Sequence, residues 1–196
     1  MPNTNLDEPF TLFQKWYSEA EAKEIDVPSA MSVSTVDPRG RPSSRMVLLK
    51  QFDSDGFVFY TNLESRKGGD IVENAYVSLL FHWKSLKKQI RIEGPAVLVE
   101  DAVADAYFAT RDRGSQIGAW ASKQSHPMEG RHDLEKQIAI HTAKFGISTI
   151  PRPPFWSGYR VPPDQIEFWS DGTFRLHERT VYTRQSDGWR TERLFP

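Results

Sequence analysis

The hydrophobic and polar positions of the chain follow a helical period at the start and a strand-like pattern over most of the rest. Over about residues 7–24 the apolar side chains recur every three or four positions, which predicts an amphipathic helix. The residues of its apolar face are Phe10, Phe13, Tyr17 and Ala20. Because Asp7 stands at the expected N-cap and Pro9 in the first turn, the start of this helix is well marked.

Five short stretches after this helix are rich in β-branched and aromatic residues and are separated by turn residues, as β-strands are. They cover residues 30–36, 45–50, 57–61, 76–83 and 89–99. The tripeptide Ser-Asp-Gly occurs three times between strand-like runs, at 54–56, 170–172 and 186–188, and Asp-Gly favours type I′ hairpins. The pattern therefore predicts a mainly antiparallel sheet, and closure into a small barrel would remove its exposed edges.

A helical section separates the two groups of strands. Helical spacing of apolar residues predicts helices over residues 101–111 and about 128–145. The proline-rich stretch at 150–156 ends the helical part and returns the chain to the sheet. Because no repeat and no linker composition stands out, we expect a single domain over residues 1–196, mainly β with helices (α+β).

Composition excludes several classes of function. The formal net charge of the 196 residues is -1, so no overall field favours nucleic acid or an anionic membrane, and any anion site must be local. The absence of cysteine excludes disulfides, thiolate nucleophiles and zinc-cysteine sites. Neither a signal peptide nor an apolar run of membrane-spanning length is visible, and we expect a cytoplasmic protein.

Two common kinds of catalytic site find no support in the sequence. The five histidines show no i, i+4 pair and no acidic cluster beside them, so we predict no metal. A Gly-x-Ser-x-Gly nucleophile motif is also missing, which argues against a serine hydrolase.

One candidate anion site lies just after a predicted strand. Ser65 is a plausible N-cap for a short helix, and Arg66 and Lys67 follow it directly. The free N–H groups and the dipole of a helix N-terminus attract an anion, and Gly68 and Gly69 let a ligand approach the backbone. The alternative is a solvated basic turn.

A second candidate is the set Tyr107, Arg111 and Ser115, which are spaced four apart. On one helical face these three side chains would present a phenol, a guanidinium and a hydroxyl to the same phosphate. The alternative is a surface helix with one aromatic residue packed inward. Arg45 and Lys50, at the two ends of a predicted strand, are five apart and should face opposite sides, as unrelated end-of-strand charges would.

The stretch "FRLHER" at 174–179 raises a third question. As a strand it would place Arg175, His177 and Arg179 on one face, because successive side chains alternate. Such a row is either the solvated face of an edge strand or the wall of an anion site, and the local sequence does not decide between them.

Taken together, these segments resemble the pyridoxamine 5′-phosphate oxidase family, flavin enzymes of vitamin B6 metabolism, from about residue 7 to 196. The most specific part is "IEFWSDGTFRLHER", which is similar to the family signature, although Ser170 stands where the family usually has Gln. The N-terminal segment is also shorter than in some members. The resemblance implies an antiparallel split β-barrel homodimer that binds FMN at its interface, with residues of about 151–196 in dimerisation.

By the same resemblance, residue roles follow for cofactor and substrate. The FMN-binding residues would be Arg45, Met46, Val47, Leu48, Leu49, Lys50, Tyr60, Thr61, Arg66, Lys67, Gln89, Gln124, Ser125, Trp169 and Arg179. The substrate-binding residues would be Lys50, Tyr107, Arg111, Ser115, Arg175, Leu176 and His177. Arg175 and His177 would be catalytic and lie beside the reacting carbon.

The activity implied is the oxidation of pyridoxamine 5′-phosphate and pyridoxine 5′-phosphate to pyridoxal 5′-phosphate. Hydride transfer to FMN would be followed by reoxidation with O2, giving H2O2, in vitamin B6 synthesis or salvage. Two alternatives stay open: another split-barrel flavin oxidase, of the phenazine-biosynthesis type, and a non-catalytic module that binds FMN or pyridoxal phosphate.

Overall fold

The computed structural model describes residues 8–196, and the chain in it begins with the helix α1 (Glu8–Lys23). Phe10, Phe13 and Ala20 on this helix are fully buried, which confirms the predicted aromatic face. The predicted N-cap, Asp7, lies outside the described residues. Phe13 packs against the ring of Phe57 at 4.8 Å between centroids, so α1 closes one side of the main core.

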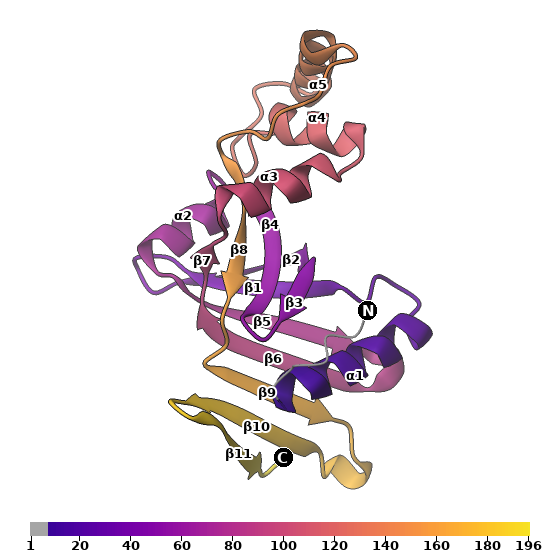
Figure 1. Ribbon diagram of the computed structural model, residues 1–196, viewed down its shortest axis with the longest axis vertical. Helices are drawn as coiled ribbons and strands as arrows, with labels where there is room; N and C mark the ends of the chain where they lie inside the picture. Colours follow the sequence, from indigo (N-terminus) through magenta and orange to yellow (C-terminus); the bar gives the residue numbers. More distant parts are fainter. Residues whose placement is uncertain (1–7) are drawn as a thin grey trace.

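Two antiparallel sheets form the body of the molecule (Figure 1). The larger sheet contains, in spatial order, β11 (Gly188–Leu194), β10 (Glu178–Gln185), β9 (Gln165–Ser170), β6 (Lys88–Pro95), β5 (Tyr76–Trp83), β1 (Ala30–Val36) and β2 (Pro42–Leu48). The smaller contains β3 (Gln51–Asp53), β4 (Gly56–Asn62), β8 (Trp156–Val161) and β7 (Val97–Leu98). The expected antiparallel arrangement is confirmed, since every recorded strand pair is antiparallel.

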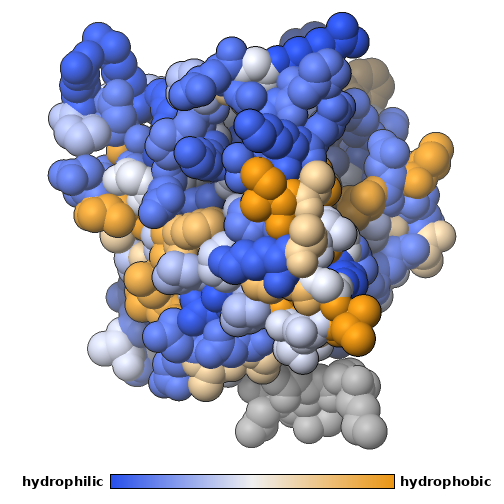
Figure 2. All heavy atoms as spheres, turned by 90° about the horizontal axis from the view of Figure 1, so that it is seen from above, coloured by the Kyte–Doolittle hydropathy of each residue, from blue (hydrophilic) through white to orange (hydrophobic). Residues whose placement is uncertain are grey.

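Four further α-helices follow in the described residues: α2 (Arg66–Glu73), α3 (Asp101–Ala109), α4 (Arg113–Ala121) and α5 (Asp133–Phe145). Figure 1 shows α3, α4 and α5 stacked at the end of the molecule opposite to β10 and β11. Phe108, Ile117 and Trp156 anchor them in a small second core. Seen from above (Figure 2), mostly hydrophilic side chains cover this face, with small apolar patches between them.

Several predicted boundaries were wrong where the chain passes from one sheet to the other. The stretch 89–99 is two strands, β6 in the larger sheet and β7 in the smaller, separated at Ala96. The stretch 45–50 ends as a strand at Leu48, after which the buried Leu49 leads into the smaller sheet. Residues 101–111 and 128–145 contain shorter helices than predicted, and α4 was not predicted as a helix.

Two of the three Ser-Asp-Gly tripeptides form tight hairpins, at β3–β4 and β10–β11. Gly56 and Gly188 have positive φ (130° and 139°), whereas the two loop residues before each of them do not, so the predicted type I′ turn was wrong. The third tripeptide, at 170–172, forms no hairpin, because β9 ends at Ser170 and β10 begins only at Glu178.

The stretch "FRLHER" is not a continuous strand, so the condition for a shared face of its cations is not met. Phe174 and Arg175 have left-handed backbone conformations (φ 55° and 64°) within a short 3-10 turn, and two such residues in succession break the strand alternation. Only Glu178 and Arg179 belong to β10. Arg175, His177 and Arg179 therefore do not share one strand face.

Candidate functional site

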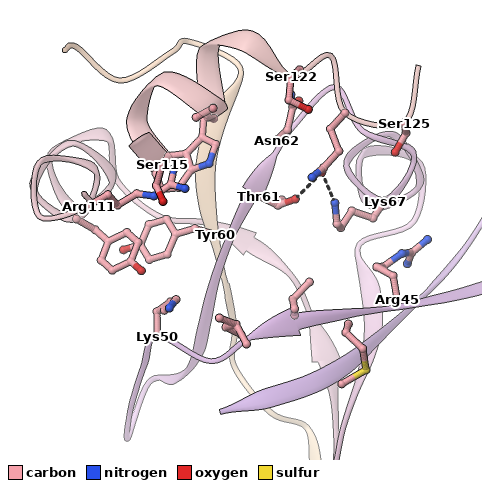
Figure 3. Close-up of a pocket in the computed structure, with 18 of the residues that line it drawn as sticks. Arg45, Lys50, Tyr60, Thr61, Asn62, Lys67, Arg111, Ser115, Ser122 and Ser125 are labelled. Carbon is pink, nitrogen blue, oxygen red and sulfur yellow. Dashed lines mark hydrogen bonds between the residues drawn. The ribbon is translucent and has the colours of Figure 1, made fainter. Parts of the chain in front are cut away.

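A cavity of about 1100 Å³ lies between β2, β4, the start of α2 and the α3–α4 connection (Figure 3). This volume exceeds that of a typical pocket for one drug-sized ligand. The cations that line it are Arg45, Lys50, Arg66, Lys67 and Arg111, whereas Asp112 is the carboxylate residue in its lining. The cavity is therefore suited to anionic ligands.

The start of α2 and the neighbouring Arg45 of β2 form the first anion seat, which we define as Arg45, Arg66 and Lys67. Ser65 caps α2 by accepting a hydrogen bond from the Gly68 N–H, as predicted from the sequence. The Lys67 ammonium donates to Ser65 Oγ at 3.0 Å and to Gln124 Oε1 at 2.6 Å, so its place beside the helix start is fixed.

Lys67 is only 7% exposed. Burial, followed by repulsion from the Arg45 cation, lowers the pKa of its ammonium to about 8. Burial likewise lowers the pKa of the Arg45 guanidinium, which bonds to Thr35 Oγ1 at 2.8 Å and lies 3.8 Å from the carboxylate of Asp70. The first anion seat thus holds more positive charge than its protein neighbours neutralise.

Tyr107, Arg111 and Ser115 form the second anion seat, although they do not lie on one continuous helix. Tyr107 is on α3, Arg111 lies in the connection, and Ser115 is in the first turn of α4. Asp112 caps α4 by accepting from the Ser115 N–H at 2.8 Å, and this turn aims all three side chains into the cavity. Lys50 faces the same space from the opposite wall (Figure 3).

Aromatic rings fix the walls of the second anion seat. Tyr107 stacks on Tyr60 with centroids 4.0 Å apart, and the Arg111 guanidinium lies 4.8 Å from the centre of the Trp156 ring. Burial lowers the pKa of Arg111. Its Nη1 is buried without a hydrogen-bond partner among residues 8–196, which marks a donor that a ligand is needed to satisfy.

Most of the predicted cofactor residues also line this cavity, while others do not. Met46, Val47, Leu48, Thr61 and Ser125 contribute to its lining. Leu49 instead points into the main core and is 5% exposed. Sequence reasoning missed Asn62, Trp156 and Ser122, whose positions carry no charge or motif that would have signalled a site.

A second group of predicted residues lies on the larger sheet, away from the cavity. Gln89, Trp169 and Arg179 are direct cross-strand neighbours on β6, β9 and β10, so they form one row across three strands. The ring of His177 lies 4.7 Å from that of Trp169. None of these residues lines the cavity of the same chain, nor do the exposed Arg175 and Leu176.

Comparison with known proteins identifies the family. A family model described as pyridoxamine 5′-phosphate oxidase matches residues 18–141. The chain belongs to the pyridoxamine 5′-phosphate oxidase family. A second model of this family, described as the pyridoxine 5′-phosphate oxidase C-terminal dimerisation region, matches residues 156–196. This region contains Trp169 and Arg179 of the row, whereas Gln89 lies outside it.

Curated members of the oxidase family are similar over nearly the whole chain. A pyridoxine/pyridoxamine 5′-phosphate oxidase of Rhodospirillum rubrum is 54% identical over 96% of both chains. One of Caulobacter vibrioides is 57% identical over 100% of this chain and 88% of its own. Among solved structures, PhzG from Burkholderia lata 383 in complex with tetrahydrophenazine-1-carboxylic acid is 34% identical with a TM-score of 0.91, over 98% of this chain and 95% of that one.

These findings confirm the resemblance and the fold class inferred from the sequence. The chain has the split-barrel architecture of the oxidase family, and membership implies a flavin cofactor. Among the described helices, none is long and apolar enough to cross a membrane. The cytoplasmic location stays a prediction.

Proposed function

We propose that the chain oxidises pyridoxine 5′-phosphate and pyridoxamine 5′-phosphate to pyridoxal 5′-phosphate with FMN as its cofactor. The observation that carries this proposal is the second anion seat, where the buried Nη1 of Arg111 lacks a partner among the described residues. The first anion seat has its own cations. Two separate seats in one cavity suit two phosphorylated molecules, a cofactor and a substrate.

The first anion seat fits the phosphate of FMN. Arg66 and Lys67 stand at the N-terminus of α2, where backbone N–H groups and the helix dipole add to their charge. Thr61 and the residues of β2 that follow Arg45 would hold the rest of the cofactor. When bound, FMN supplies the hydride acceptor for oxidation at the 4′ carbon, and O2 is the final oxidant, reduced to H2O2.

The second anion seat would hold the substrate phosphate and so orient the ring. Tyr107, Ser115 and Arg111 supply three donors from one side, and Lys50 supplies a cation from the other. The stacked rings of Tyr60 and Tyr107 form a firm wall on this side of the cavity.

Arg175 and His177 would reach the substrate from a second copy of the chain. In their own chain they lie in the loop between β9 and β10 and do not line the cavity. The family's dimerisation region includes this loop. A homodimer would bring the loop of each protomer, with Gln89, Trp169 and Arg179, over the cavity of its partner and leave the cofactor at the interface. The whole chain then acts as one domain per protomer.

A phenazine-type oxidase is the competing function, since PhzG shares the fold at 34% identity. The compound in that structure, tetrahydrophenazine-1-carboxylic acid, carries a carboxylate with two acceptor oxygens, whereas the phosphate of a phosphorylated pyridine offers three oxygens and more negative charge to the second anion seat. This difference favours the vitamin B6 substrates.

The visible spectrum of the purified protein tests the proposal. Without oxygen, pyridoxine 5′-phosphate should bleach the yellow flavin as one equivalent of pyridoxal 5′-phosphate forms, and air should restore the colour and allow further turnover. A flavin that stays oxidised with this substrate but is bleached by a dihydrophenazine would establish the phenazine-type function. If neither compound bleaches it, the protein is a binding module.

A further inference from the structure

Glu167 is a buried carboxylate that joins two arginines on the larger sheet. It lies on β9 and is 4% exposed. Arg91, its direct cross-strand neighbour on β6, donates from Nη2 to Oε2 at 2.6 Å. Arg179, on the strand at the other side, donates from Nε to Oε1 at 2.7 Å. Each carboxylate oxygen therefore holds one guanidinium.

These contacts fix the plane of the Arg179 guanidinium. Its Nη1 donates to the Phe195 carbonyl at 3.2 Å, so two edges of the planar group are held by the protein. Its Nη2 has no hydrogen-bond partner among residues 8–196. The hydrogen bond to Glu167 raises the pKa of Arg179, which keeps the group charged.

Arg179 belongs to the row with Gln89 and Trp169, and Glu167 lies beside this row and contacts its Arg179 member. Glu167 and Trp169 are two residues apart on β9 and share a sheet face. A buried carboxylate needs one cation for neutrality, and Arg91 already supplies it from directly opposite. The second contact instead restricts Arg179.

We infer that Glu167 is a positioning residue for the cofactor: it fixes the Arg179 guanidinium in the orientation that contacts FMN, while Arg91 holds and neutralises Glu167. This inference rests on the proposed FMN site. A positioning role and a purely electrostatic role of Glu167 predict opposite changes in FMN affinity when the carboxylate is removed. Loss of a negative charge near an anionic cofactor would strengthen binding, whereas loss of the fixed Arg179 geometry weakens it.

The experiment measures the dissociation constant of FMN by fluorescence titration of apo-protein. For Glu167→Gln we expect the constant to rise about tenfold, less than for the direct loss of a charge-assisted hydrogen bond, because Arg179 itself is kept. Glu93→Gln is the matched control, because Glu93 lies on the same face 3.4 Å from Arg91 and is not in contact with Arg179. This control should leave the constant unchanged.

A double-mutant cycle separates positioning from a general structural effect. If Glu167 acts through Arg179, Glu167→Gln adds no further weakening in an Arg179→Gln background. Equal weakening in both backgrounds, unchanged affinity, or tighter binding would each overturn the inference. If Glu167→Gln does not fold, Glu167→Asp, which keeps the charge but shortens the reach, enters the same cycle. Wild-type protein that binds no FMN would instead refute the proposed cofactor.

Discussion

Replacement of Arg111 by methionine should separate substrate recognition from stability. Methionine keeps an unbranched apolar side chain against Trp156 and removes the guanidinium. In the unliganded protein, the buried Nη1 has no partner among the described residues, and such an atom costs about 1–3 kcal/mol. The lost contact with the Trp156 ring offsets this by about 0.5–2 kcal/mol. The variant should thus unfold at the same temperature as the wild type or slightly higher.

Activity should respond in the opposite direction. A charge-assisted contact to a substrate phosphate contributes about 2–3 kcal/mol, so kcat/KM for pyridoxine 5′-phosphate should fall by about 30- to 150-fold. The assay follows pyridoxal 5′-phosphate formation with FMN in excess, beside unphosphorylated pyridoxine as a second substrate. The slow reaction of pyridoxine should change little, because that compound has no phosphate and so makes no contact of this kind with Arg111.

Arg39→Met provides the matched control, since Arg39 is an exposed cation in the β1–β2 turn outside the cavity. It should leave both substrates unaffected. An equal loss on the phosphorylated and unphosphorylated substrates in Arg111→Met would refute the assignment of the second anion seat. A large fall in unfolding temperature would refute the argument about the unpaired donor.

Three other experiments test the remaining parts of the site. Since the pKa of Lys67 is lowered to about 8 and a phosphate prefers the charged ammonium, FMN affinity of the apo-protein should fall as pH rises through 8. The pKa of this lysine is about 10.5 in the unfolded chain and about 8 in the folded one, so between these values the unfolded chain binds more protons. This group should therefore make the apo-protein more stable as pH rises from about 8 to about 10.5. Lys67→Met should abolish both the pH dependence of FMN affinity and this contribution to stability. Gly68→Ala should cost about 1–3 kcal/mol, because its Cβ would meet a backbone carbonyl oxygen at 1.9 Å, whereas Gly69→Ala, with nothing within 4 Å, should be tolerated in thermal unfolding. Co-expression of the weakened Arg111→Met and His177→Ala chains should restore up to about a quarter of wild-type activity if each site combines two protomers. It should restore no activity beyond that of the single variants if each site lies within one protomer.

Sequence analysis predicted well those helices and strands that bury one face in the core along their whole length, because the pattern of apolar residues then shows their period. Residues of β1 alternate between the core and the other face, with Met31, Val33 and Thr35 buried, so a period of two marks the strand. The predictions failed where the pattern continued but the environment changed. The apolar sequence continues past Ala96 although the chain there leaves one sheet for the other, and the preceding Gly94 and Pro95 mark a break without specifying which sheet receives the chain.

The two anion seats were predictable from spacing for different reasons. Ser65, Arg66 and Lys67 are consecutive at a capped helix start, where local sequence determines the geometry. Tyr107 and Ser115 were grouped by an assumed continuous helix, and they meet because Asp112 starts a new helix that keeps them on the same side. The grouping was right although the helix behind it was wrong.

The assignment of Gln89, Trp169 and Arg179 to the same site came from resemblance, and spacing could not have supplied it. The three are distant in sequence and meet only through strand pairing. They form a row of their own, and the step from that row to the cavity requires a second chain. Local patterns carry no information about assembly, so this part of the site depends on the dimer proposal.

The unliganded cavity is itself destabilising, and this connects stability to function. Arg45, Lys67 and Arg111 are all buried enough that their pKa values fall, which means that folding brings positive charge out of water without full compensation. A bound anion restores the missing interactions and binds only the folded state. Ligand at 100 times its dissociation constant should therefore stabilise the fold by about 2.7 kcal/mol, and the effect of FMN should persist in Arg111→Met while that of a phosphorylated substrate is lost. The two seats can thus be measured separately by thermal unfolding, without any turnover.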